Sequence, residues 1–150
     1  MDNRLGAVYE KLNKLDSAKY YRSRVFNYGV ASNNLFRILT GSTGLGDIYR
    51  KQNNRDSAFY YYRIGVSAAA KGSISVIYNN GMVKLASLHW QDRQVDSATY
   101  YAQKAFRQSQ NTRNFLPMIA AAELLAEIFY EKKSARQCLQ IFTPGGGIKG

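Results

Sequence analysis

Asp56-Ser57-Ala58, followed one residue later by Tyr60-Tyr61, is the stretch that decides the fold, because the chain contains it three times. The other two copies lie one 40-residue step before and after it: Asp16-Ser17-Ala18 with Tyr20-Tyr21, and Asp96-Ser97-Ala98 with Tyr100-Tyr101. A leucine followed by a small residue keeps the same step at Leu5-Gly6, Leu45-Gly46, Leu85-Ala86 and Leu125-Ala126. A fixed period of this length is typical of an array of stacked helical hairpins.

The second repeat shows how one hairpin is encoded. Its spacing predicts a first helix over about 34–52 and a second over about 56–71, with Asn53-Asn54-Arg55 as a polar turn. Asp56 is the expected N-cap of the second helix, because its carboxylate can accept hydrogen bonds from free backbone amides. Ala58 is small where the two helices approach closely, and Gly46 is the expected small residue on the facing helix.

These residues carry a family resemblance. Leu45-Gly46, a tyrosine three residues on at Tyr49 and an alanine nine residues later at Ala58 resemble the tetratricopeptide repeat. The 40-residue repeat exceeds the usual length of about 34 residues, as in the long variant found in kinesin light chains and bacterial signalling regulators. The resemblance implies an all-α, right-handed α-α superhelix, a solenoid of stacked helical hairpins with about seven or eight helices. It also implies protein or peptide binding.

The register divides the chain into one repeat domain, residues 1–142, and a flexible glycine-rich tail, residues 143–150. The expected repeats are 1–33, 34–73, 74–113 and 114–142. The fourth is degenerate, because Arg136-Gln137-Cys138 replaces Asp-Ser-Ala and Thr143-Pro144 should end its second helix early. We expect Ala18, Ala58, Ala98 and Cys138 to be buried at equivalent places. Both ends of the array lack a polar cover, which predicts that the terminal helices meet another copy of the chain or a neighbouring domain.

The composition narrows the choice of partner. The 150 residues carry 21 Lys and Arg against 10 Asp and Glu, a net charge of +11. A second reading is therefore a nucleic-acid-binding helical array that uses basic residues of the convex second helices: Lys19, Arg22, Arg63, Lys104 and Arg107. No apolar stretch approaches the length of a membrane span. The compartment stays open, with the cytoplasm favoured.

Catalysis has little support in this sequence. His89, the single histidine, occupies the aromatic slot of Tyr9, Tyr49 and Phe129, and Cys138 occupies the alanine slot. The glycine-rich stretch 41–46 lacks the Lys-Ser/Thr of a phosphate-binding loop. Glu123, Glu127 and Glu131 share one helical face, but a single imidazole makes a carboxylate metal site a poor prediction. We expect no enzyme activity, no cofactor and no metal.

The resemblance places a ligand groove along the first helices. Its expected protein-binding residues come from two rows and one acidic neighbour: Arg50, Trp90 and Tyr130, which continue the row of Glu10; Asp47, Ser87 and Glu127, which continue the row of Ala7; and Glu123. Trp90 and Arg50 belong to the residue types enriched at binding hot spots. An alternative is that Trp90 packs against Tyr130. Of the lysine and asparagine clamp that chaperone-binding members use, only Lys84 has the right charge.

The resemblance therefore implies a non-enzymatic protein- or peptide-binding module, the sensing or scaffolding part of a larger bacterial regulatory protein. Glu123 and Glu127 make one end of the groove acidic, so the expected partner is a basic or mixed segment. Binding of nucleic acid is the alternative, and a steep loss of affinity with salt would identify it.

Overall fold

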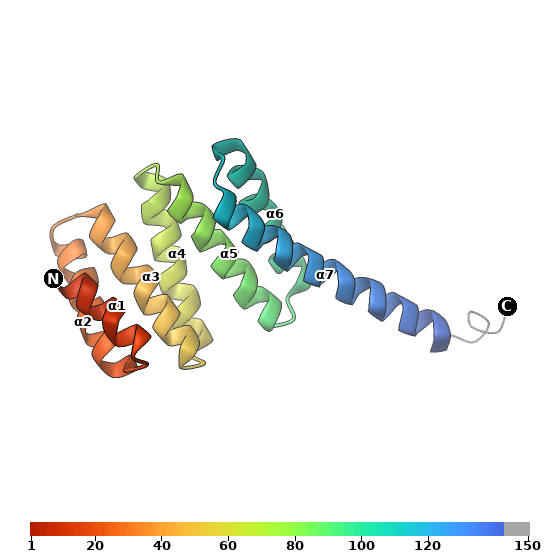
Figure 1. The fold of residues 1–150 in the computed structure, drawn as a ribbon, viewed down its shortest axis with the longest axis horizontal. Coiled ribbons are helices and arrows are strands. Elements are labelled where there is room, and N and C mark those ends of the chain that lie inside the picture. The colour runs from red at the N-terminus through yellow and green to blue at the C-terminus, as the bar shows by residue number, and fades with distance from the viewer. Residues whose placement is uncertain (143–150) are drawn as a thin grey trace.

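The computed structural model describes residues 1–142, and the side chains of all of them except 138 and 140–142. These residues form an all-α array in which consecutive helices pack against each other (Figure 1). Its seven helices are α1 (Asp2–Lys11), α2 (Leu15–Ala31), α3 (Leu35–Lys51), α4 (Arg55–Lys71), α5 (Ser75–Gln91), α6 (Val95–Thr112) and α7 (Phe115–Phe142). The predicted solenoid of stacked helical hairpins is therefore confirmed.

The turns between helices recur at half the period seen in the sequence. Six non-glycine residues have positive φ, one in each turn and at a regular 20-residue step: Asn13, Asn33, Asn53, Ser73, Arg93 and Arg113. In the turn of the second hairpin, the next amide, of Asn54, donates to the Tyr49 carbonyl at 2.9 Å, which closes the end of α3 in a Schellman-like turn. Consecutive helices therefore alternate in direction along the array, and the five from α2 to α6 have 17 or 18 residues each.

The geometry of this turn also determines which residue caps α4. Asn54, and not Asp56, is the N-cap of α4, and its side chain accepts a hydrogen bond from the Ser57 amide at 3.2 Å. Because Asn53 reverses the chain in a single left-handed residue, α4 already begins at Arg55. The prediction that Asp56 is the cap is wrong by two residues, and Asp56 stabilises the helix as an acidic residue of its first turn.

The core repeats with the chain. Ala18, Ala58 and Ala98 are fully buried, as the register predicts; Cys138 lies outside the described side chains. Next to these alanines, an aromatic ring of each first helix stacks on a tyrosine of the following helix. The three stacked pairs have ring centroids 5.5, 5.5 and 5.2 Å apart: Tyr9 with Tyr21, Tyr49 with Tyr61, and His89 with Tyr101.

The structure also overturns the prediction of a fourth hairpin. Residues 114–142 were expected to turn and start a second helix, but α7 runs unbroken for 28 residues. The next turn in the 20-residue series would fall at Lys133, where the chain has the helix-favouring run Glu131-Lys132-Lys133. Arg136 replaces the acidic first-turn residue of the other second helices, so the signal that starts a new helix is missing. The predicted tail, 143–150, lies outside the described residues.

Within residues 1–142, no helix combines the length and the apolar character that crossing a bilayer requires.

Candidate functional site

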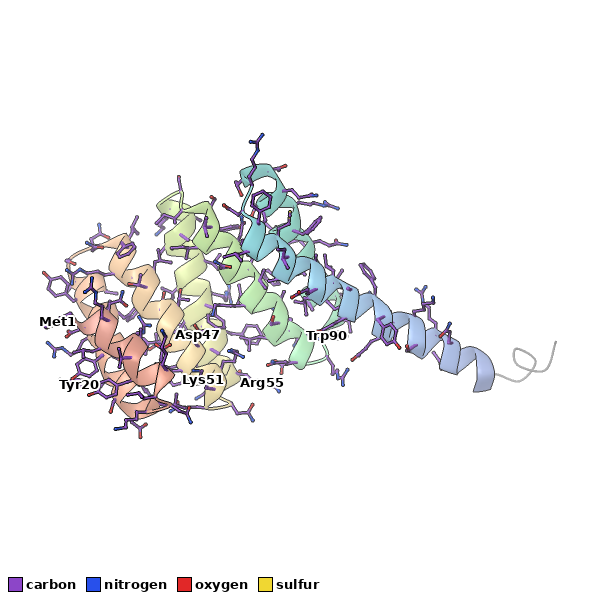
Figure 2. All side chains as sticks on the ribbon, viewed as in Figure 1. Met1, Tyr20, Asp47, Lys51, Arg55 and Trp90 are labelled. Carbon is purple, nitrogen blue, oxygen red and sulfur yellow. The ribbon has the colours of Figure 1, made fainter. Side chains whose placement is uncertain are left out.

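The candidate site is the surface formed by the first helices α1, α3, α5 and α7, called here the first-helix surface. Figure 2 labels two of its residues, Asp47 on α3 and Trp90 on α5. The structure leaves four of the predicted binding residues exposed and three half-buried. The exposed ones are Arg50, Glu123, Glu127 and Tyr130, and the half-buried ones are Asp47, Ser87 and Trp90.

Trp90 combines a packing role with an accessible edge. Its indole packs against a buried cluster that includes Ala86, Ala98 and Leu124, so α5, α6 and α7 meet beneath it. The Arg93 guanidinium lies over the ring, 6.0 Å from its centroid. Trp90 is therefore held in place from below by the core and from one side by a cation. Such a rigid, half-exposed aromatic is a suitable anchor for a partner.

A polar cluster lies at the junction of the second and third hairpins. The Asp47 carboxylate accepts a hydrogen bond from the Tyr62 hydroxyl at 2.5 Å and forms an ion pair with Lys84. Burial of the phenol, the negative charge of Asp47 and this hydrogen bond raise the pKa of Tyr62 above its ordinary value, and Arg50 opposes the rise. Asp47 and Lys84 are both partly exposed, so the cluster is at once structural and accessible.

The first hairpin fills the equivalent place with a different polar group. Arg22 was expected on the convex surface, as part of the basic row. Instead its guanidinium donates to Glu10 at 2.6 Å and to Asn3, and the side chain is only 12% exposed. It reaches inward because Gly6 and Gly44 have no side chains to block it: a Cβ on Gly44 would lie 2.4 Å from Arg22 Nε. Arg22 is therefore not one of the convex surface cations that the nucleic-acid-binding hypothesis requires.

These two clusters occupy one register position that sequence reasoning missed. Arg22, Tyr62 and Ala102 follow the same 40-residue step on α2, α4 and α6, and the facing residues on the first helices change with them. A glycine faces each large side chain, whereas Ala86 is tolerated where the second helix carries Ala102. The signal in the sequence was Tyr62, the third tyrosine of a run where the other repeats have only two.

Ion pairs tie consecutive hairpins together along the array. Besides Asp47 with Lys84, Arg55 pairs with Asp92, and Arg93 pairs with Glu131 at 2.8 Å. The second joins the start of α4 to the turn after α5, and the third joins that turn to α7. Because each pair joins residues 37 or 38 positions apart, the pairs help to set how one hairpin is rotated on the next.

The single histidine, His89, has a packing role. The His89 ring stacks nearly parallel on Tyr101, with 6° between the planes, and its Nδ1 lies 2.6 Å from Gln94 Oε1. This is the role that Tyr9 and Tyr49 have in the earlier hairpins. Among the described residues, no three His, Cys, Asp or Glu side chains are grouped so that they could hold a metal ion.

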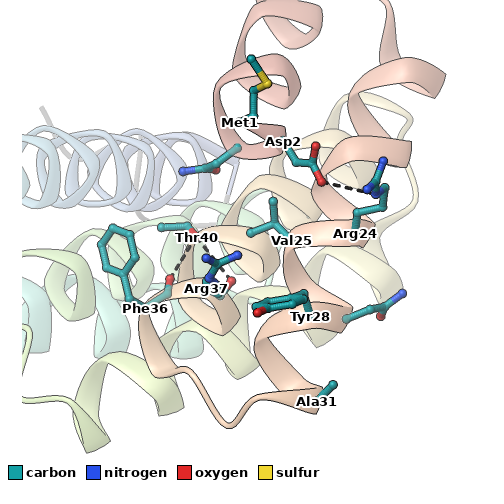
Figure 3. Close-up of a pocket in the computed structure, with 11 residues that line it drawn as sticks. Met1, Asp2, Arg24, Val25, Tyr28, Ala31, Phe36, Arg37 and Thr40 are labelled. Carbon is teal, nitrogen blue, oxygen red and sulfur yellow. Dashed lines mark hydrogen bonds and ion pairs between the residues drawn. The ribbon is translucent and has the colours of Figure 1, made fainter.

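A hollow of about 830 Å³ lies away from the predicted binding residues, between the start of α1, the second half of α2 and the start of α3 (Figure 3). Tyr28, Phe36 and Arg37 line it, together with the ion pair of Asp2 with Arg24. It exists because α1 has 10 residues whereas α3 has 17, so α1 covers only part of α2. A longer first helix in this register would fill it, and we therefore do not assign it a ligand.

Comparison with protein-family models and with curated proteins finds no match for this chain.

Proposed function

We propose that this chain is a non-enzymatic module that binds a protein or peptide segment on its first-helix surface, as a tetratricopeptide-like repeat. The supporting observation is the contrast between positions that keep the same residue type in successive repeats and positions where the residue type varies. The alanine and aromatic-stack positions repeat along the chain because packing demands them, whereas the row of Arg50, Trp90 and Tyr130 varies at every step and stays at least partly accessible.

The charges on this surface favour a segment of mixed or basic character. Glu123 and Glu127 lie one helical turn apart on α7, are exposed, and have no ion-pair partner among the described residues. Tyr130, 73% exposed, continues toward the C-terminal end of the same helix. A lysine or arginine of the bound segment would meet these carboxylates, while an apolar residue beside it packs on Trp90.

The resemblance to long tetratricopeptide repeats also suggests the kind of protein to which the module belongs. We propose that the module is the sensing or scaffolding part of a larger bacterial regulatory protein. This proposal rests on Leu45-Gly46, Tyr49 and Ala58, and on their repetition along the chain.

Selection from a phage-displayed library of linear peptides, followed by titration of the selected peptides into the full chain, tests the binding site. Trp90→Ala should weaken binding about 30-fold, the equivalent of about 2 kcal/mol for a hot-spot residue. Arg50→Ala, at an exposed position, should weaken it by a smaller factor. Tyr100→Ala is the matched control, because Tyr100 is exposed on α6 and should leave affinity unchanged.

Two results would overturn this assignment. One is a set of peptides that bind the Trp90 and Arg50 variants as tightly as the parent chain. The other is tight binding of a single-stranded oligonucleotide whose affinity falls steeply with salt and which the selected peptides do not displace, since that behaviour indicates phosphate contacts instead.

A further inference from the structure

Among residues 1–142, no helix covers the second face of α7, which lies away from the first-helix surface. In the first three hairpins, the following helix covers this face and places a tyrosine on the ring at Tyr9, Tyr49 or His89. Phe129 occupies the same position in α7 and is 50% exposed. The main contacts of α7 within the described residues are with α5 and α6, which lie on its other side. Within residues 1–142, α7 therefore has the packing face for an eighth helix, but no helix occupies it.

The continuous helix prevents the chain from filling this place with its own register equivalent. Position 141 corresponds to the stacking tyrosines 21, 61 and 101. In an unbroken helix it lies 12 residues from Phe129, or about 18 Å along the axis at 1.5 Å per residue. Figure 1 shows this last part of α7 extending beyond the other helices. The register equivalent of the stacking tyrosines therefore cannot cover Phe129.

The charge around Phe129 selects the kind of helix. A hollow of about 420 Å³ beside it is lined by Lys132, Lys133, Arg136 and Gln137. None of the three cations has an ion-pair partner among the described residues. Together with the exposed ring, they form an apolar floor with a basic rim, which favours an acidic group.

The chain's own second helices have the matching pattern. Each carries an aspartate in its first turn, five residues before the stacking tyrosine, as in Asp96 and Tyr101 of α6. Laid antiparallel on α7 with its tyrosine over Phe129, such a helix would bring the aspartate alongside Lys133 and Arg136. Two copies paired symmetrically through their α7 helices would instead bring Lys132, Lys133 and Arg136 against like charges.

From these contacts we infer that α7 docks a single amphipathic helix of a partner protein, with an acidic residue in its first turn and an aromatic residue five positions later. The partner helix completes the fourth hairpin from outside the chain. This surface is distinct from the peptide site proposed above, since it lies on the side of α7 that an eighth helix would cover in a regular repeat.

A peptide with the sequence of α6, Val95–Thr112, labelled with fluorescein, serves as the probe, and anisotropy reports its binding to the full chain. Phe129→Ala and Lys133→Glu should each weaken binding about tenfold or more, because one removes the ring partner and the other reverses a rim charge. Leu116→Ala, at an exposed position near the start of α7, is the control and should bind like the parent. Peptides with Asp96→Lys or Tyr101→Ala should bind correspondingly weakly.

Circular dichroism establishes that each variant keeps its helix content, as expected for exposed positions. The inference is overturned if the peptide shows no saturable binding, or if it binds the Phe129→Ala chain as well as the parent. It is also overturned if light scattering shows a dimer of the chain that Phe129→Ala dissociates, because a second copy would then be the occupant of this face.

Discussion

Replacing Gly46 by alanine should destabilise the array, although alanine is the better helix former. An ideal Cβ at this position would lie 2.4 Å from Cδ1 and 2.5 Å from Cε1 of Tyr62. The ring cannot move aside easily, because it is 1% exposed and its hydroxyl is bonded to Asp47. Overpacking of this kind costs about 1–3 kcal/mol, and the gain in helix propensity offsets about 0.5–1 kcal/mol. The expected net loss is about 1–2 kcal/mol.

The effect of Gly46→Ala on stability should change sign when the Tyr62 ring is absent. Tyr62→Ala alone should cost about 3–5 kcal/mol, as large-to-small changes of buried aromatic residues do. In that background Gly46→Ala should stabilise by about 0.5–1 kcal/mol, since only the helix propensity term remains. The chain already contains this combination in its third hairpin, where Ala86 and Ala102 are both buried.

Urea unfolding followed by circular dichroism, applied to the two single variants and the double variant, measures the coupling. Gly72→Ala is the control, because a Cβ there would make ordinary contacts at 3.4 Å and its φ of −83° suits alanine. It should change stability by a few tenths of a kcal/mol or raise it slightly. If Gly46→Ala has the same sign in both backgrounds, Tyr62 is not what the glycine accommodates, and the reasoning fails.

Three further perturbations test other parts of the structure. Because burial and a neighbouring carboxylate raise the pKa of Tyr62, its contribution to stability should be complete below about pH 10 and decline above it; Tyr62→Phe should flatten the fall of the melting temperature measured across that range. Arg113→Gly should stabilise and Asn53→Ala should destabilise the chain by about 1 kcal/mol each in urea unfolding, because both positions have left-handed backbone, with φ of 55° and 59°. His89→Tyr should leave the thermal midpoint nearly unchanged, because tyrosine makes the equivalent stack in the first two hairpins; a large loss would show that the hydrogen bond to Gln94 matters more than the ring stack on Tyr101.

The candidate site was predictable in position but not in its chemistry. Register alone placed Arg50, Trp90 and Tyr130 on first helices, and it identified Lys84 as a cation on the same surface. It could not show that Lys84 is paired with Asp47, because the two residues are 37 positions apart and meet only when hairpins stack. Arg22 was misplaced for the same reason: its direction depends on the space that Gly6 and Gly44 leave on two other helices.

The sequence by itself determined the features that depend on local interactions. The 40-residue repeat, the helix pairs and the burial of Ala18, Ala58 and Ala98 all follow from side-chain periodicity and turn residues within one hairpin. Tertiary structure decided what fills the shared position of Arg22 and Tyr62. It also left Phe129 uncovered, because α7 does not turn back. These outcomes depend on which side chains meet across helices, and packing there balances volume and charge from residues far apart in the chain.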